Sequence, residues 1–216
     1  MNKDEVINEF RDAGALLEGH FILSSGLHSS KYLQCALALS EPSRAKRLSL
    51  ALSQKIKEKF KENIDLIVSP AMGGVIIGHE IARNLNVPFI FLERVNGIFE
   101  LRRGFSIKSG SKCLLVEDIV TTGLSSNESI EVINKNGGNV VGEACLIDRS
   151  CGKADLETEL VSLTSFDIPT FDSNNIPEEL INVPAIKPGS RNISEIIGQH
   201  SALNRASLGP TQRCKY

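Results

Sequence analysis

Four short apolar segments, separated by stretches with helical periodicity, constrain the fold of this chain more than any other feature. They are residues 64–68, 87–92, 113–116 and 140–147. Each is an almost continuous apolar run, which is typical of strands that are buried on both faces of a parallel sheet. Strands that alternate with helices predict an α/β fold, in which helices flank a parallel sheet.

The helices that we expect between these strands are amphipathic. One begins with Pro42 in its first turn, and its apolar positions recur from Ala45 to Phe60. A second follows Gly73-Gly74, and a third opens at Gly123 and ends at Gly137-Gly138. Ligands bind beyond the carboxyl ends of the strands in open α/β sheets. The site is therefore expected in the segments that follow the strands, namely 69–74, 93–104, 117–125 and 148–149.

The N-terminal residues do not follow the alternation. Apolar residues from Val6 to Leu17 predict a helix that Gly19 stops, and residues 20–26 and 32–35 predict short strands. The other end of the chain is polar and looks peripheral. We therefore expect a small N-terminal hood segment, an α/β core and a polar C-terminal tail, at residues 1–40, 41–190 and 191–216.

Composition excludes several classes of function. The chain has 216 residues, 41% of them apolar, which suits one globular domain with an appendage. It has no tryptophan, two tyrosines and a net charge of −2, so we expect no nucleic-acid partner. No run approaches the ~20 apolar residues of a membrane span, and the first residues do not resemble a signal peptide. The five cysteines lack metal-binding spacing and suit a reducing compartment. We expect a cytoplasmic protein without a membrane partner.

The most informative segment for chemistry is 114–126, in which a buried strand runs into Glu117 and Asp118 and then into a turn rich in hydroxyls. Unpaired N–H groups at a helix N-terminus bind phosphate, and Gly123 permits a tight turn. The two acids suit hydroxyl groups or a metal ion, so a phosphorylated sugar would satisfy both halves of the segment. Helix capping by Asp118 and the serines explains the same residues equally well. A Walker-type loop and a G-x-G-x-x-G loop are both missing from the sequence.

Residues 116–123, Val-Glu-Asp-Ile-Val-Thr-Thr-Gly, closely resemble the donor-binding signature of type I phosphoribosyltransferases. Residues 69–74 are similar to the pyrophosphate loop of that family. Four more segments resemble the orotate phosphoribosyltransferases in particular: 14–21, 23–29, 101–105 and 147–149. The similarity covers roughly residues 13 to 150, and 187–191 look like the usual end of the family core.

The resemblance implies an enzyme of pyrimidine biosynthesis that transfers ribose 5-phosphate from 5-phosphoribosyl 1-pyrophosphate to orotate, giving orotidine 5'-monophosphate and pyrophosphate. It implies a type I phosphoribosyltransferase-like sheet, Mg²⁺ carried on the donor's oxygens with no protein ligand assigned, and a homodimer with shared active sites. The implied catalytic residues are Arg94, Arg102, Arg103 and Asp118, and the implied orotate contacts are Thr121 and Arg149. The implied donor contacts are Ala71, Met72, Gly73, Arg94, Glu117, Asp118, Ile119, Val120, Thr121, Thr122, Gly123, Leu124 and Ser125.

The chain departs from the family in two places. Ser25 stands where many members have lysine, and residues 94–104 lack the lysines and the His-Gly-Glu-Gly-Gly run of many members. No lysine or histidine role can therefore be transferred to this loop, and its arginines have a second interpretation as a basic surface loop. Arg149 likewise has a second interpretation, a surface pair with Asp148. A purine or xanthine phosphoribosyltransferase and a non-catalytic donor-binding regulator remain as alternative functions.

Overall fold

The structure is a computed structural model that describes residues 1–23 and 26–187. The chain divides into two compact units. The large unit comprises Met1–Leu17 and Leu33–Ile168, and the small unit comprises Glu18–Tyr32 and the chain from Pro169 onward. The residues that the sequence groups as 1–40 are thus shared between the two units.

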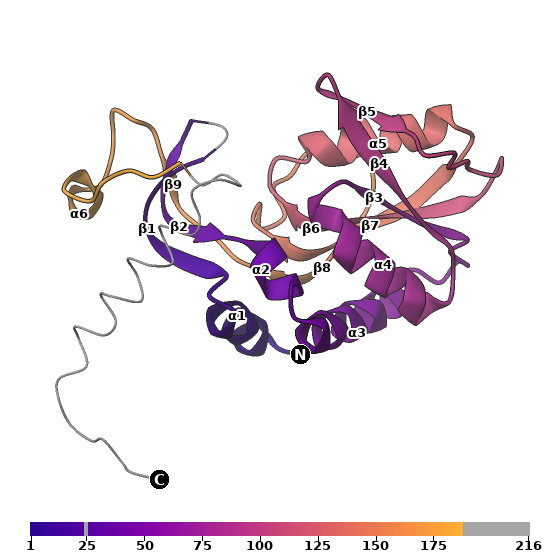
Figure 1. The fold of residues 1–216 in the computed structure, drawn as a ribbon, viewed down its shortest axis with the longest axis horizontal. Coiled ribbons are helices and arrows are strands. Elements are labelled where there is room, and N and C mark those ends of the chain that lie inside the picture. Colours follow the sequence, from indigo (N-terminus) through magenta and orange to yellow (C-terminus); the bar gives the residue numbers. More distant parts are fainter. Residues whose placement is uncertain (24–25, 188–216) are drawn as a thin grey trace, which may run out of the picture. The chain divides into compact units, whose positions relative to one another are not determined.

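A six-stranded sheet forms the centre of the large unit, in the order β5-β4-β3-β6-β7-β8 (Figure 1). Its strands are parallel except for β4 and β5, which pair antiparallel. The predicted parallel α/β sheet is therefore confirmed, and each of the four predicted strands is present. The strands are β3 Leu66–Pro70, β4 Phe89–Val95, β5 Ile98–Leu101, β6 Lys112–Val120, β7 Asn139–Asp148 and β8 Leu160–Ser165.

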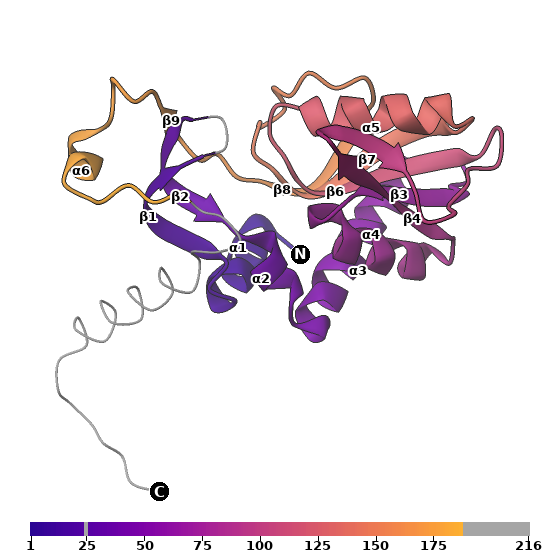
Figure 2. The same cartoon turned by 45° about the horizontal axis from the view of Figure 1, so that its top comes forward.

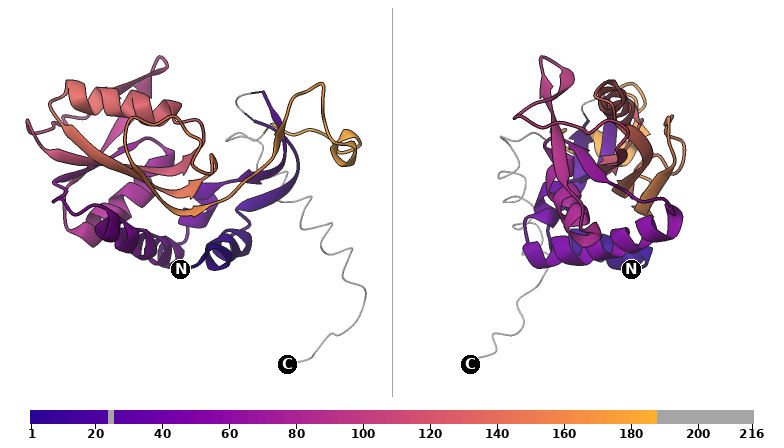
Figure 3. Two further views of the ribbon diagram at one scale, coloured as in Figure 1. Left: turned by 180° about the vertical axis from the view of Figure 1, so that it is seen from behind. Right: turned by 90° about the vertical axis from the view of Figure 1, so that its right-hand side faces the viewer.

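Helices cover both faces of this sheet. Two helices, α3 (Pro42–Lys59) and α4 (Gly73–Leu85), lie on one face, and α5 (Leu124–Lys135) lies on the other (Figures 2 and 3). Two separate clusters of buried apolar side chains fill the layers, because alternate residues of a strand point to opposite faces. Leu114 and Val116 of β6 pack toward α3 and α4, whereas Cys113 and Leu115 pack toward α5.

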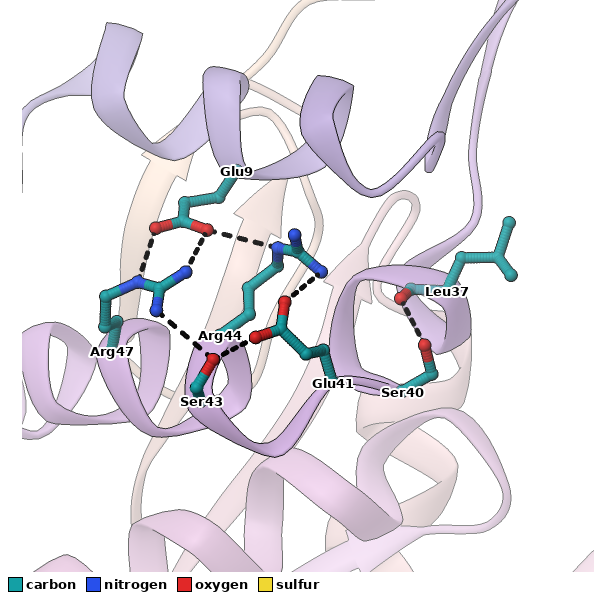
Figure 4. A network of polar contacts seen from close by, with 7 residues as sticks. All are labelled: Glu9, Leu37, Ser40, Glu41, Ser43, Arg44 and Arg47. Carbon is teal, nitrogen blue, oxygen red and sulfur yellow. Dashed lines mark hydrogen bonds and ion pairs between the residues drawn. The ribbon is translucent and has the colours of Figure 1, made fainter. Parts of the chain in front are cut away.

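An ion-pair network fastens α1 (Lys3–Asp12) to α3 (Figure 4). Glu9 accepts hydrogen bonds from Arg47 Nε at 2.7 Å and from Arg44 Nε at 3.1 Å, and Arg44 also pairs with Glu41 at 3.0 Å. The side chains of Glu9 and Arg44 are only 16% and 12% exposed, so solvent screens this pair less than a surface pair. The hydrogen bond from Arg47 is the main cause that lowers the pKa of Glu9.

The predicted continuation of the first helix to Gly19 is wrong. The helix ends at Asp12, and β1 (Leu16–Ile22) already contains Leu17. The reason is Gly14, whose φ of 62° lies in the left-handed region that closes a helix and that glycine adopts without steric cost. A strand predicted at 32–35 is displaced as well, since β2 spans His28–Leu33 and α2 begins at Cys35 (Cys35–Leu39).

The small unit contains a sheet in the order β1-β2-β9, with β9 at Thr170–Phe171, and a short helix α6 at Glu178–Ile181. His20 lies within this unit, where its Nδ1 contacts the carbonyl of Val183 at 2.9 Å and its Nε2 contacts His28 Nδ1 at 2.6 Å. Because a carbonyl only accepts, Nδ1 of His20 is the donor of the first bond. In the part of the chain that the structure describes, no helix combines the length and the apolar character of a membrane span.

Candidate active site

The two acids at the end of β6 lie on opposite faces of the sheet. Asp118 continues the row of Leu114 and Val116 and faces α4, whereas Glu117 continues the row of Leu115 and faces α5. Glu117 is 7% exposed and Asp118 is partly buried. The strand therefore places one carboxyl group in each layer, directly before the turn that opens α5.

Asp118 lies against the first residue of α4, which directly follows the loop after β3. A Cβ atom on Gly73 would meet Asp118 Oδ1 at 2.5 Å, and one on Gly74 would meet the carbonyl oxygen of Val116 at 2.7 Å. The parallel pairing of β3 with β6 thus joins the two segments that sequence predicts as the donor turn and the pyrophosphate loop. Burial raises the pKa of Asp118, and hydrogen bonds from backbone N–H groups and from the Cys35 thiol oppose the rise.

The pKa of Glu117 is strongly perturbed. Burial is the main cause that raises its pKa to about 9, with further contributions from Asp118 and Glu143, while Arg94 acts in the opposite direction. A carboxyl group in such surroundings keeps its proton at neutral pH in the free protein. Perturbed carboxyl groups of this kind concentrate at functional sites, so Glu117 supports the candidate site on physical grounds.

The turn after Val120 has the geometry of an anion site. Asn127 N–H donates the first bond of α5, to the Gly123 carbonyl at 2.9 Å, so the N–H groups of residues 124–126 precede the helical ladder. Thr121, Thr122, Leu124 and Ser125 are exposed around them. Gly123 has a φ of 88°, and a Cβ atom there would meet the carbonyl oxygen of Asp155 at 2.7 Å. Glycine is therefore required at this position for both conformation and space.

Arg149 lies beside this turn. Its backbone N–H donates to the carbonyl of Val120 at 2.9 Å, and Val120 is in register with Asp148. Asp148 is buried, and its carboxylate accepts bonds from Ser150 N–H, Ser150 Oγ and Gly152 N–H at 2.8, 2.6 and 2.9 Å. The carboxylate of Asp148 thus shapes the turn that follows β7, and the neighbouring strand ends bring Arg149 next to Thr121.

The segment predicted as the loop 93–104 is largely a β-hairpin. Asn96 and Gly97 have φ values of 49° and 87° and connect β4 to β5, with Val95 paired to Ile98. Two consecutive positive φ values match the tight two-residue turn that suits strand twist, and Asn-Gly is its preferred sequence. Asn96 and Gly97 therefore form the hairpin turn between β4 and β5.

The three predicted catalytic arginines are not gathered at one point. Arg94 pairs with Glu128 of α5 at 2.6 Å and lies over the ring of Phe99 at 3.9 Å. Arg103 pairs with Glu93 at 2.7 Å, on the face that carries Phe91. Arg102 is exposed and forms no ion pair within residues 1–23 and 26–187. Exposed ion pairs are weak because solvent screens them, so an anionic ligand can compete for Arg94 and Arg103.

One buried acid was not identified from the sequence. Glu143 of β7 is 0% exposed and accepts a hydrogen bond from Ser126 Oγ of α5 at 2.7 Å. Burial raises the pKa of Glu143 to about 7, while the bond from Ser126 opposes the rise. The available signal was a single charged residue inside the apolar run 140–147, because acids are almost never fully buried without a partner.

Comparison with known proteins places the chain among close relatives. Residues 39–180 match the family model described as "Phosphoribosyl transferase domain". A curated protein of Erythrobacter litoralis described as orotate phosphoribosyltransferase is 54% identical over 191 residues, which cover 88% of this chain and 99% of that protein. The solved orotate phosphoribosyltransferase of Aeropyrum pernix is 27% identical with a TM-score of 0.62, over 74% of this chain and 93% of that one. The adenine phosphoribosyltransferase of Thermoanaerobacter pseudethanolicus, 20% identical with a TM-score of 0.53 over 63% of this chain and 88% of that one, shows likeness of fold alone.

Proposed function

This chain belongs to the orotate phosphoribosyltransferase family, and from that premise we propose that the carboxyl ends of β3, β6 and β7 form the site of transfer. The reaction moves ribose 5-phosphate from 5-phosphoribosyl 1-pyrophosphate to orotate, with release of pyrophosphate. The observation that carries the proposal is the meeting of three predicted segments: Asp118 lies against Gly73, and Arg149 is bonded to Val120. One bound molecule can therefore reach all of them.

We propose the following division of roles at this site. Glu117 and Asp118 address the ribose hydroxyls, and the hydroxyls and N–H groups of residues 119–125 hold the 5-phosphate. Residues 71–73, of which Met72 and Gly73 are exposed, receive the pyrophosphate, and Arg94, Arg102 and Arg103 supply cations for it. Arg149 and Thr121 receive the orotate, because a planar guanidinium binds a carboxylate through two parallel hydrogen bonds.

Catalysis at this site rests on charge placement. Breaking the bond at the ribose C1 leaves positive character on the sugar and gathers negative charge on pyrophosphate, so preorganised cations lower the barrier. Guanidinium groups stay protonated at any working pH, which makes the three arginines electrostatic groups rather than proton donors. Mg²⁺ suits phosphate oxygens and keeps part of its water shell, so the donor's own oxygens would hold it and it would add charge at the leaving group.

A base-selection assay tests the function directly. The protein, Mg²⁺ and the donor are mixed in turn with orotate, adenine, hypoxanthine and xanthine, and pyrophosphate release is followed. We expect release with orotate alone. Release with a purine base would identify a different phosphoribosyltransferase, and donor binding without release for any base would identify a regulator.

Replacing Arg149 with alanine should raise the KM for orotate by a factor on the order of 10 to 100 and leave the KM for the donor within about twofold. The lost contact is a hydrogen-bonded charge pair worth about 1.5–3 kcal/mol, and orotate alone supplies its partner. Steady-state kinetics with each substrate varied separately measure the two constants. If the variant keeps its affinity for orotate, a residue other than Arg149 binds the orotate carboxylate.

We also propose a two-fold homodimer in which the 93–104 hairpin reaches the partner's site. An inactive Arg102→Ala/Arg103→Ala parent and an inactive Asp118→Asn parent should regain activity when they are dissociated and reassociated together. In a shared-site dimer, one of the two active sites of the mixed dimer then contains both sets of substitutions, and the other contains none. Recovery of at most about half the activity of each mixed dimer is expected from that count.

The complementation has a direct control. The two parents carry different affinity tags, so that tandem purification yields mixed dimers alone. If purified mixed dimers stay inactive, each hairpin serves its own subunit. Activity above half of wild type would also contradict the model in which each active site uses one hairpin from the partner subunit.

A further inference from the structure

A buried carboxyl group lies directly beneath the first turn of α5. Glu143 is 0% exposed and Ser126 is 2% exposed, and the Ser126 hydroxyl donates to Glu143 Oε1 at 2.7 Å. Ser126 is the third residue of α5, and its backbone N–H is one of those that precede the helical ladder. The Glu143 side chain is thus linked, through one hydrogen bond, to the first turn of α5, which follows the proposed phosphate-binding residues.

The remainder of the Glu143 carboxyl group is unsatisfied. Its Oε2 atom is buried and has no hydrogen-bond partner in the described part of the chain. A buried polar atom without a partner destabilises the fold, and an apolar residue of similar size would avoid that cost. Other elements place three charged or titratable groups near Glu143 and Glu117: Glu117 itself on β6, Arg94 on β4 and Glu128 on α5. None of them is bonded to Glu143 in the described chain.

We propose that Glu143 is a positioning residue for the donor's 5-phosphate, acting through Ser126 to fix the first turn of α5. The inference rests on the proposed function of that turn. Glu143 serves as a neutral acid, since a charged carboxylate beneath a phosphate would oppose binding. Burial raises its pKa to about 7, so the neutral form predominates below neutral pH. Glutamine has the same shape and the same accepting oxygen, so it should replace Glu143 without loss.

Four variants separate this role from simple packing: Glu143→Gln, Glu143→Leu, Ser126→Ala and the double variant Glu143→Leu/Ser126→Ala. Each is assayed for pyrophosphate release with the donor and orotate varied separately, and for its melting temperature. We expect Glu143→Leu and Ser126→Ala each to raise the KM for the donor on the order of tenfold, with kcat and the orotate KM within about twofold. Glu143→Gln should match wild type.

The double variant decides whether the two residues act as one unit. Residues that act through a single contact show non-additive effects, so its donor KM should equal that of either single variant. A folded Glu143→Leu protein with a wild-type donor KM would overturn the proposal, and so would multiplied effects in the double variant or an equal rise in the orotate KM. If Glu143→Leu fails to fold, Ser126→Ala carries the test: a donor KM within twofold of wild type would refute the role.

A binding measurement keeps this inference distinct from the proposed function. Inorganic phosphate is titrated calorimetrically into wild type, Glu143→Gln and Glu143→Leu without base or donor. Wild type that binds phosphate but releases no pyrophosphate with orotate would refute the proposed function alone. Glu143→Leu that binds phosphate as tightly as wild type would refute the role of Glu143, whatever the turnover.

Discussion

Replacing Thr121 and Thr122 together with alanine should raise the KM for 5-phosphoribosyl 1-pyrophosphate by a factor on the order of 100 or more. Both side chains are exposed at the turn before α5. Thr122 Oγ1 accepts a weak bond from Leu124 N–H at 3.4 Å, which leaves its hydroxyl hydrogen available to an anion. Each hydrogen bond to a charged group contributes about 1.5–3 kcal/mol, and 1.4 kcal/mol corresponds to tenfold in affinity.

The matched control for this double variant is Ser109→Ala. Ser109 is an exposed hydroxyl in the turn that precedes β6, at the opposite end of the same strand, so its loss should leave the donor KM unchanged. The donor KM is measured at saturating orotate, and circular dichroism checks folding. Unchanged donor affinity in the folded double variant would show that this turn does not bind the 5-phosphate.

Replacing Glu117 with glutamine should stabilise the free protein above neutral pH. Burial, Asp118 and Glu143 raise the pKa of Glu117 from 4.5 to about 9. As the pH rises from 4.5 to 9, the unfolded chain releases this proton while the folded chain keeps it. The unfolded state then binds fewer protons, so the free energy of unfolding falls with rising pH in this window. Glutamine cannot ionise and removes that loss.

The expected gain in the free energy of unfolding is near zero at pH 4.5 and reaches a few kcal/mol at pH 9, since one unit of pKa corresponds to about 1.4 kcal/mol. Urea titrations of wild type and Glu117→Gln at pH 5, 7 and 9 measure it. Glu131→Gln, on the exposed face of α5, provides a control that should show no such trend. A variant with the same pH profile as wild type would show that Glu117 ionises normally.

The parts of this molecule that could be predicted are those that depend on local pattern. Continuous apolar runs gave the four central strands, and the rule for ligands in parallel sheets then placed 69–74, 117–125 and Arg149 at one edge. The meeting of Asp118 with Gly73 follows from the neighbouring positions of β3 and β6. The signature residues are close together because two adjacent strands end at the same level.

Other features depend on pairings that periodicity does not reveal. Arg94 and Arg103 lie apart because β4 extends to Val95 and pairs with β5 through the Asn96-Gly97 turn, so the expected loop 93–104 is largely a hairpin. The contact of Glu143 with Ser126 depends on the register of β7 against β6, which shifts between Cys113 and Leu114. The small sheet pairs His28 with Phe171, residues far apart in the chain.

The hairpin formed by β4 and β5 lowers the conformational entropy cost of donor binding. Fixing the backbone of one flexible residue costs about 1–2 kcal/mol of conformational entropy. A disordered lid of this length would therefore weaken ligand binding substantially when it became ordered. Four ladder pairs, from Leu92–Leu101 to Val95–Ile98, have already ordered this segment during folding. Arg94 therefore lies on a hairpin whose backbone is ordered before the substrate arrives, and a ligand that attracts this arginine has a side chain to reorient rather than a loop to fold.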